Sequence, residues 1–168
     1  MNYSFRCALA MAVGICMLPA CDDSCSDVIC SAPNSTCVEG RCVCIAGYEG
    51  ANCDQLSYVK FEGSYQVSEN CLSSSGGSQN KTYSASIYRS GSRIDIITIN
   101  NLGSLGIAAD ATIVDATRLY LSRQNAGLTT INGGQGTYEE TTRRIRLEYQ
   151  YNVGGSVAYE CTAIFSKF

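Results

Sequence analysis

The sequence predicts an all-β protein in which a small disulfide-rich module precedes an eight-stranded antiparallel up-and-down β-barrel. Three observations favour this fold class. The chain of 168 residues has 11 cysteines, and six of them lie close together between positions 25 and 53. From position 58 onward, apolar and polar residues alternate with the period of two that is typical of half-buried strands. No stretch shows a helical period of comparable strength.

The composition excludes several classes of active site. The chain has no histidine, which rules out serine–histidine and cysteine–histidine nucleophiles and histidine-ligated zinc. Its cysteine content argues against a reduced cytosolic setting. A binding or structural role is therefore favoured, and we expect no enzymatic activity, cofactor or metal. An enzyme built from this chain would need Asp, Glu, Lys or Tyr as its general base.

Residues 1–20 have the anatomy of a signal peptide. A short, weakly basic start at residues 1–6 precedes an uncharged, mostly apolar run of 14 residues, from 7 to 20, which is too short to span a bilayer comfortably. The run ends in Leu18-Pro19-Ala20-Cys21, which resembles the bacterial lipobox. The resemblance implies cleavage before Cys21, acylation of that residue and a lipidated linker over residues 21–24. An ordinary secretory signal that happens to precede a cysteine is the alternative.

Several acyl chains on one residue would anchor the protein stably without a membrane span. Asp22 and Asp23 follow directly and resemble the sorting signals of Gram-negative lipoproteins, which imply export to the outer face in some lineages and retention at the inner membrane in others. A solvated linker explains them equally well. We therefore expect the membrane to be a partner through the lipid anchor. The expected location is the cell envelope of a Gram-negative bacterium, at the surface of the outer membrane.

The cysteine count fits an oxidising compartment. Cys7 and Cys16 leave with the signal peptide and Cys21 is lipidated, so 11 minus 3 leaves eight, an even number suited to four disulfides. Six of the eight have the spacing C-x4-C-x6-C-x4-C-x-C-x8-C. About 30 residues cannot bury enough apolar surface to fold without such bridges. Spacing alone cannot choose among the pairings.

Over residues 25–54 this spacing, with Gly47, Tyr48 and Gly50 in the last loop, resembles an EGF-like module. The resemblance implies that the first cysteine pairs with the third, the second with the fourth and the fifth with the sixth. The implied disulfides are Cys25–Cys37, Cys30–Cys42 and Cys44–Cys53.

Residues 56–168 are expected to form the barrel. Eight strands are predicted from alternation, near residues 59–67, 83–90, 93–99, 111–115, 118–122, 135–140, 144–151 and 157–166. Turns are expected between them, including one at the glycine-rich run Asn132–Gly136. Closing the sheet removes its free edges, and eight strands leave an interior that side chains just fill or that holds one small ligand.

The remaining two cysteines support closure. Cys71 and Cys161 fall on the inward phase of the first and last strands, which become neighbours only when the barrel closes. A disulfide across this loop of about 90 residues would contribute about 4 to 5 kcal/mol in the chain-entropy model. Phe61-x-Gly63-x-Tyr65 resembles the glycine–aromatic opening of lipocalins, with tyrosine in place of the usual tryptophan. The resemblance implies a lipocalin-like barrel.

The candidate binding residues are the bulky aromatic side chains of the inward phase. They either fill the barrel or line a mouth for a small apolar ligand. The residues are Phe61, Tyr65, Tyr83, Tyr149, Tyr151 and Tyr159. The leading hypothesis is a non-enzymatic surface lipoprotein acting as a binding or adhesion module for a protein or glycan partner. The alternative is a carrier of a small apolar ligand inside the barrel.

Two further motifs are given structural interpretations. Ser57-Tyr58-Val59-Lys60 matches the Ser-x-x-Lys string of serine acylases, but that chemistry needs a helix, and we expect a strand here. Arg143, Arg144 and Arg146 are expected to be solvated on an outer face, since a secreted chain of net charge −3 is not suited to nucleic acid.

Overall fold

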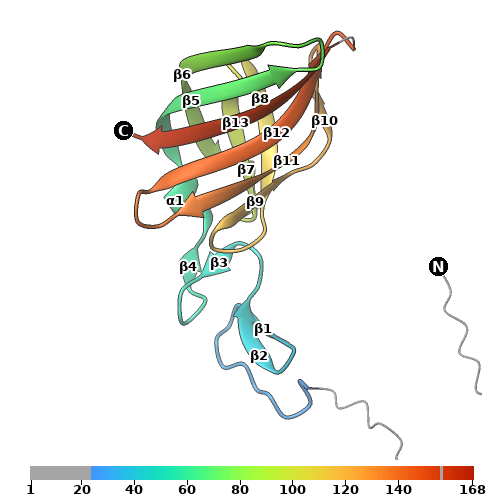
Figure 1. Cartoon of the computed structure of the whole chain (residues 1–168). Coiled ribbons are helices and arrows are strands. Elements are labelled where there is room, and N and C mark those ends of the chain that lie inside the picture. The colour runs from blue at the N-terminus through green and yellow to red at the C-terminus, as the bar shows by residue number, and fades with distance from the viewer. Residues whose placement is uncertain (1–23, 156) are drawn as a thin grey trace, which may run out of the picture.

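The structure is a computed structural model that describes residues 24–155 and 157–168. It is all-β except for one short helix, with a small N-terminal module followed by a closed barrel (Figure 1). The expected signal peptide and the lipidation site Cys21 lie outside the described residues. Within the described part of the chain, no helix is long and apolar enough to span a bilayer.

The disulfide-rich module consists of two small antiparallel sheets. Its strands are β1 (Ser35–Val38), β2 (Arg41–Cys44), β3 (Tyr48–Glu49) and β4 (Gln55–Leu56). Strand β1 pairs with β2, and β3 with β4. The β1–β2 turn contains Glu39 and Gly40, both at positive φ, which is the backbone of a tight hairpin turn. Since β4 pairs with β3, the module's hydrogen bonding extends through Leu56.

Three disulfides hold the module together, and their pairing is the one that the resemblance to an EGF-like module implied. They join Cys25 to Cys37, Cys30 to Cys42 and Cys44 to Cys53. The apolar side chains of the module contribute little to its stability through burial, because Ile29, Val38, Val43 and Ile45 are between 41% and 92% exposed. Covalent bridges therefore replace a hydrophobic core here.

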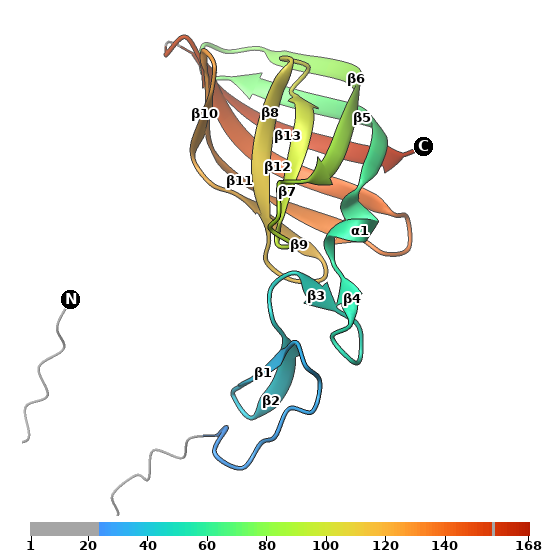
Figure 2. The ribbon, with the colours of Figure 1, turned by 180° about the vertical axis from the view of Figure 1, so that it is seen from behind.

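The barrel is formed by strands that follow one another around a ring. Its strands are β5 (Gly63–Ser73), β6 (Ser78–Arg89), β7 (Ile96–Leu102), β8 (Ile107–Ile113), β9 (Arg118–Leu121), β10 (Gln124–Ala126), β11 (Thr129–Glu139), β12 (Arg144–Val153) and β13 (Val157–Lys167). All neighbours are antiparallel, and β13 returns to pair with β5, which closes the ring (Figures 1 and 2). The predicted eight-stranded up-and-down barrel is thus confirmed, with β9 and β10 as two pieces of one interrupted strand that both pair with β11.

Gln124 seals the gap that this interruption leaves beside β8. Its side-chain carbonyl accepts a hydrogen bond from the Asp110 backbone N–H at 2.8 Å, and its amide donates to the Asp110 carbonyl, also at 2.8 Å. One side chain thus supplies both bonds that a neighbouring strand residue would have made.

The predicted alternation is clearest in β12. Ile145, Leu147, Tyr149 and Tyr151 are buried, whereas the residues between them are exposed. The other strands also alternate between buried and exposed residues, and their inward side chains pack into one apolar cluster. The disulfide Cys71–Cys161 joins β5 to β13 at directly paired positions, as predicted for two strands that become neighbours when the barrel closes.

The segment before the first barrel strand differs from the prediction. Residues 58–61 form a one-turn helix, α1 (Tyr58–Phe61), rather than the start of a strand, and β5 begins at Gly63. The helical turn brings Phe61 over the end of the barrel, where it is fully buried, while Val59 stays 56% exposed. Burial of one aromatic ring in the barrel end outweighs the strand preference of a short apolar run.

The prediction of a turn at the glycine-rich run Asn132–Gly136 is also wrong. The run lies inside β11, where the register against β12 shifts between Ile131 and Gly133. Asn132 is the extra residue of a β-bulge. The glycines serve a close approach of strands: a Cβ at Gly134 would lie 2.6 Å from the Glu148 carbonyl.

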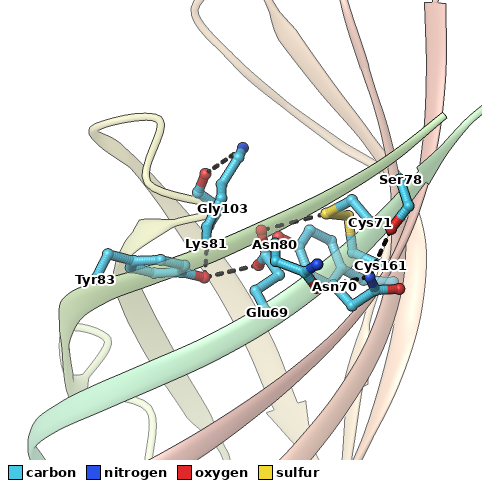
Figure 3. The surroundings of a disulfide bond; sticks show 10 residues. Glu69, Asn70, Cys71, Ser78, Asn80, Lys81, Tyr83, Gly103 and Cys161 are labelled. Atoms are coloured by element: carbon cyan, nitrogen blue, oxygen red, sulfur yellow. Dashed lines mark hydrogen bonds between the residues drawn. A yellow bond between two sulfur atoms is a disulfide. The ribbon is translucent and has the colours of Figure 1, made fainter.

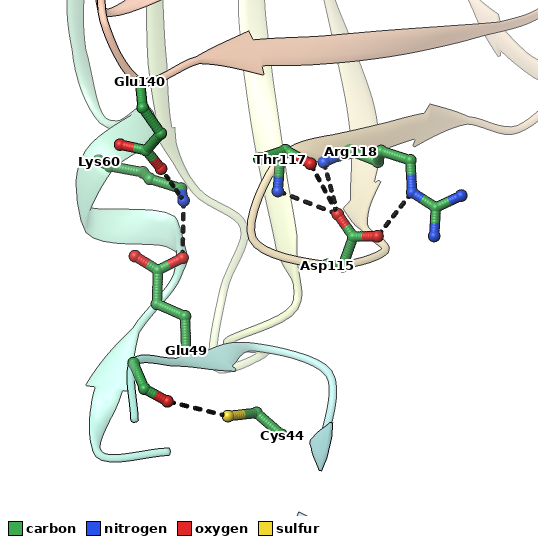
Figure 4. A network of polar contacts seen from close by, with 8 residues as sticks. Cys44, Glu49, Lys60, Asp115, Thr117, Arg118 and Glu140 are labelled. Atoms are coloured by element: carbon green, nitrogen blue, oxygen red, sulfur yellow. Dashed lines mark hydrogen bonds and ion pairs between the residues drawn. The ribbon is translucent and has the colours of Figure 1, made fainter. Parts of the chain in front are cut away.

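Module and barrel meet without a linker. The Ser57 backbone N–H donates to the Gly47 carbonyl, and Gly47 packs so closely on Ile94 of the β6–β7 turn that a Cβ would lie 2.7 Å from it. Lys60 of α1 forms ion pairs with Glu49 of the module at 2.7 Å and with Glu140 of the β11–β12 turn at 3.1 Å (Figure 4). Three parts of the chain are therefore connected through one ammonium group.

Candidate functional site

The six aromatic residues predicted to line the interior fall into two groups along the barrel. Phe61 and Tyr65 lie near α1 and are fully buried. The ring of Phe61 packs edge-on against Tyr138, with centroids 5.4 Å apart, and Tyr65 packs edge-on against Phe165 at 5.9 Å. These rings close the barrel end from which the module extends.

The second group surrounds a buried carboxylate that had not been predicted. Glu69 of β5 is 2% exposed, and its Oε2 accepts a hydrogen bond from the Tyr83 hydroxyl at 2.7 Å (Figure 3). It accepts a second hydrogen bond from the Tyr149 hydroxyl, also at 2.7 Å. The Tyr83 hydroxyl in turn accepts from the Gly103 backbone N–H at 3.0 Å. Burial, followed by the nearby Glu69 charge, raises the pKa of Tyr83 far above its ordinary value, so this hydroxyl keeps its proton and remains a donor.

Burial also raises the pKa of Tyr149 far above its ordinary value, so its hydroxyl keeps its proton and donates to Glu69. The ring of Tyr149 stacks on Tyr151 with centroids 5.8 Å apart, and Tyr151 stacks on Tyr159 at 4.9 Å. Burial raises the pKa of Tyr151 to about 12. Tyr159 is partly buried and packs against the core. Five of the six aromatic residues are therefore buried as packing side chains, and Tyr159 packs against them at the edge of the core.

Glu69 could have been found from the sequence. It lies two residues after Val67 and two before Cys71, on the phase that the alternation assigns to the interior. A carboxylate on an inward phase needs hydrogen-bond donors when buried, and tyrosines on the neighbouring inward phases supply them here.

The buried carboxylate does not form a metal site with the cysteines beside it. Ligand atoms of Glu69, Cys71 and Cys161 lie within 4.8 Å of one another. Both sulfurs belong to a disulfide, however, and metals bind the thiolate form of cysteine.

The Ser-x-x-Lys string lies on a helical turn, contrary to the strand assumed for it. Ser57 stands at the N-cap position of α1 and is 1% exposed, and its Oγ has no hydrogen-bond partner among the described residues. Lys60 is ion-paired with Glu49 and Glu140 and lies 5.1 Å from the ring centroid of Tyr138. Its ammonium group is held by two carboxylates and connects the module to the barrel.

The predicted basic cluster is solvated. Arg144 and Arg146 are exposed on β12, where Arg146 pairs with Glu148 at 2.8 Å, and Arg143 lies in the preceding turn at positive φ. Arg144 and Arg146 share the outer face of β12.

A hollow of about 500 Å³ lies on the outside of the barrel, across β9, β11, β12 and β13. We call it the wall groove. It opens beside the β11 bulge, where Gly133 presents no side chain to the outer face. Its polar and aromatic lining comes from Tyr120, Asn132, Gln135, Glu148, Gln150, Glu160 and Thr162.

The sequence did not single out the wall groove, because its residues come from four strands and meet only through their register. Tyr120 pairs with Gln135, Gln135 with Glu148, and Glu148 with Thr162. Residues paired across antiparallel strands place their side chains on the same face, about 5 Å apart. The groove therefore presents a row of four side chains that runs across the strands.

A comparison with protein-family models and with curated proteins found no match to this chain. Function is therefore argued from the geometry of the barrel and of its surface.

Proposed function

We propose that this protein is a non-enzymatic lipoprotein, anchored at Cys21, which displays the barrel at the surface of a Gram-negative cell as a binding or adhesion module. The observation that carries this proposal is the filled interior. Large side chains that include Phe61, Tyr65, Tyr151 and Phe165 are fully buried there and pack on one another. Recognition then falls to the outside of the barrel, where the wall groove lies.

The disulfide pattern supports an EGF-like identity for the spacer. First-to-third, second-to-fourth and fifth-to-sixth pairing is what the resemblance implied, and the three bridges follow it. Disulfides of this kind persist in oxidising compartments, in keeping with a protein displayed outside the cytoplasm. The closed eight-stranded barrel likewise fits a lipocalin-like domain.

The arrangement of the two parts suits presentation away from a membrane. The module extends from the barrel end that holds α1, and its first described residue, Ser24, follows Cys21 by three positions (Figure 1). An anchor at Cys21 would therefore have the module between the membrane and the barrel. Residues 21–55 carry six acidic side chains against Arg41 alone, so a module held there by the anchor would be repelled from an anionic surface and would act as a spacer that keeps the barrel away from it.

A carrier function is less well supported. A ligand inside the barrel would have to displace the stacked rings of Tyr149, Tyr151 and Tyr159 or the hydrogen bonds to Glu69. Each buried hydroxyl left without its acceptor would cost about 1–3 kcal/mol.

Cell fractionation with metabolic palmitate labelling tests the anchor, and binding of the purified chain to intact cells and to isolated envelope components tests the role. We expect label on the wild-type chain and none on Cys21→Ser, which should leave the membrane fraction. An unlabelled, soluble wild-type chain would refute the anchor. A labelled chain that binds neither cells nor envelope components would refute the binding role.

A further inference from the structure

We propose that the wall groove binds a neutral carbohydrate chain, laid across β9, β11, β12 and β13 without a metal ion. This inference rests on the proposed binding function and names its ligand class and its site. The volume of about 500 Å³ is in the range of small-molecule sites. The row from Tyr120 to Thr162 crosses three strand spacings, about 14 Å, which suits a short linear oligosaccharide better than a single compact ligand.

The lining has the chemistry that a polyhydroxylated ligand needs. The amides of Gln135 and Gln150 and the hydroxyl of Thr162 both donate and accept hydrogen bonds, while the carboxylates of Glu148 and Glu160 accept them. A sugar hydroxyl also donates and accepts, so each can be satisfied by this mixture. Gln150 and Glu160 are paired across β12 and β13, which places a second polar row beside the first.

Tyr120 supplies the apolar contact. It is 53% exposed on the outer face of β9, at the beginning of the row. A tyrosine ring offers a large, rigid apolar surface with a polar tip, which suits the C–H face of a pyranose ring that carries hydroxyls at its edge. An exposed aromatic side chain beside a row of amides and carboxylates has no evident packing role in the barrel.

Charge decides against acidic ligands. The groove is lined by two carboxylates, Glu148 and Glu160, and by no lysine or arginine. Arg146, outside this lining, pairs with Glu148 at 2.8 Å, so Glu160 supplies the main unneutralised negative charge. Placing like charges together costs several kcal/mol, so phosphorylated or uronic-acid chains should be rejected.

Backbone pairing decides against a peptide strand. All four strands beneath the groove are paired on both sides: β9 with β8 and β11, β11 with β9 and β12, β12 with β11 and β13, and β13 with β12 and β5. An extended peptide has no strand edge to join there.

The test is calorimetric titration of the full chain, purified in mild detergent, with cellotetraose, maltotetraose, mannotetraose and chitotetraose, and with tetragalacturonate as the anionic control. We expect at least one neutral tetrasaccharide to bind, tetragalacturonate not to bind, and EDTA to have no effect. Amide chemical-shift changes should map to β9, β11, β12 and β13.

Variants locate the site. Tyr120→Ala should weaken binding about tenfold or more, as loss of a central aromatic contact does, and Gln135→Ala should weaken it less. Tyr120→Phe, which keeps the ring, should bind within about threefold of wild type. Tyr88→Ala is the matched control, because Tyr88 of β6 is 46% exposed and lies outside the groove. Thermal unfolding of each variant verifies that it is folded.

Three outcomes would overturn the inference. Binding that Tyr120→Ala leaves intact would place the site elsewhere, and binding abolished by EDTA would make the carboxylates cation ligands. Failure of every neutral tetrasaccharide would reject the ligand class. If the chain then still bound intact cells, the proposed function would stand without this site; if it bound neither, both would fall.

Discussion

The module and the barrel solve the same stability problem by different means. The module has three disulfides and exposes most of its larger aliphatic side chains. The barrel has one disulfide and buries a continuous apolar cluster. A bridge in the module closes a loop of 9 to 12 residues, whereas the barrel's bridge spans 90. Cross-links are indispensable where no core can form and supplementary where one exists.

The largest expected effect is loss of the module's fold. Replacing Cys25, Cys30, Cys37, Cys42, Cys44 and Cys53 by alanine should unfold residues 25–53 completely, because little apolar burial remains to offset chain entropy. Amide chemical shifts of the module should collapse to random-coil values while those of β5–β13 persist. Native-like dispersion in the module of this variant would contradict the contrast between the two parts.

Loss of the barrel's own disulfide should lower stability without abolishing the fold. Cys71→Ala with Cys161→Ala is expected to reduce the barrel's unfolding free energy by about 4 to 5 kcal/mol, since the denatured chain loses a 90-residue cross-link. Denaturant titration followed by near-ultraviolet circular dichroism measures this change. A barrel that is unfolded in water would show that its core is weaker than its burial suggests.

Replacement of the buried Glu69 should have the next largest effect on stability. Glu69→Leu leaves the hydroxyls of Tyr83 and Tyr149 without their acceptor, at about 1–3 kcal/mol for each one orphaned. Glu69→Gln keeps an acceptor oxygen and should stay within about 1 kcal/mol of wild type. Equal loss in both variants, measured by the same titration, would mean that the charge and not the hydrogen bonding is important.

Alkaline pH should weaken the barrel more than the module. Burial raises the pKa of Tyr151 to about 12 and moves those of Tyr65, Tyr83 and Tyr149 still higher. Above pH 10 the unfolded chain releases these protons while the folded barrel retains them, so stability is full below pH 10 and falls as pH rises toward 12. The slope is at most about 1.4 kcal/mol per pH unit for each such tyrosine.

Tyr151→Phe removes one of these groups and should flatten the decline in stability between pH 10 and 12. Tyr88→Phe, which changes an exposed tyrosine, should not. Unfolding midpoints measured across this pH range distinguish the two variants.

The smallest effect concerns the junction. Lys60→Met should lower stability by about 1 kcal/mol or less, because the ion pairs that it loses are only partly buried. Its clearer consequence should be dynamic: ¹⁵N relaxation should report separate tumbling of the module and the barrel, whereas we expect the wild type to tumble as one body. Arg146→Met, which removes the surface pair with Glu148, should leave tumbling unchanged.

The sequence predicted the elements whose residue pattern repeats along the chain. It did not predict the elements whose conformation depends on a single tertiary contact. Alternation along β12 and β13 and the phase of Cys71 and Cys161 predicted the barrel and its closure. Helix α1 has one turn, too short to show a period of 3.6, and forms because Phe61 fits the barrel end.

The glycines of β11 are typical of turns, and only a register shift against β12 makes them a bulge. The wall groove likewise depends on the register of four strands, a property that single-strand patterns do not contain. The interior aromatic residues were predictable by phase, but whether they line or fill the barrel depends on the volumes of all inward side chains together.

The Gln124 seal has a consequence for crowded conditions. A gap between β8 and β10 would leave the Asp110 backbone groups open to a strand from another molecule, which is how sheets begin to polymerise. By occupying both groups, the Gln124 side chain removes that starting point at a position where the strand itself is broken. Many copies could then stand side by side at high density and remain separate molecules.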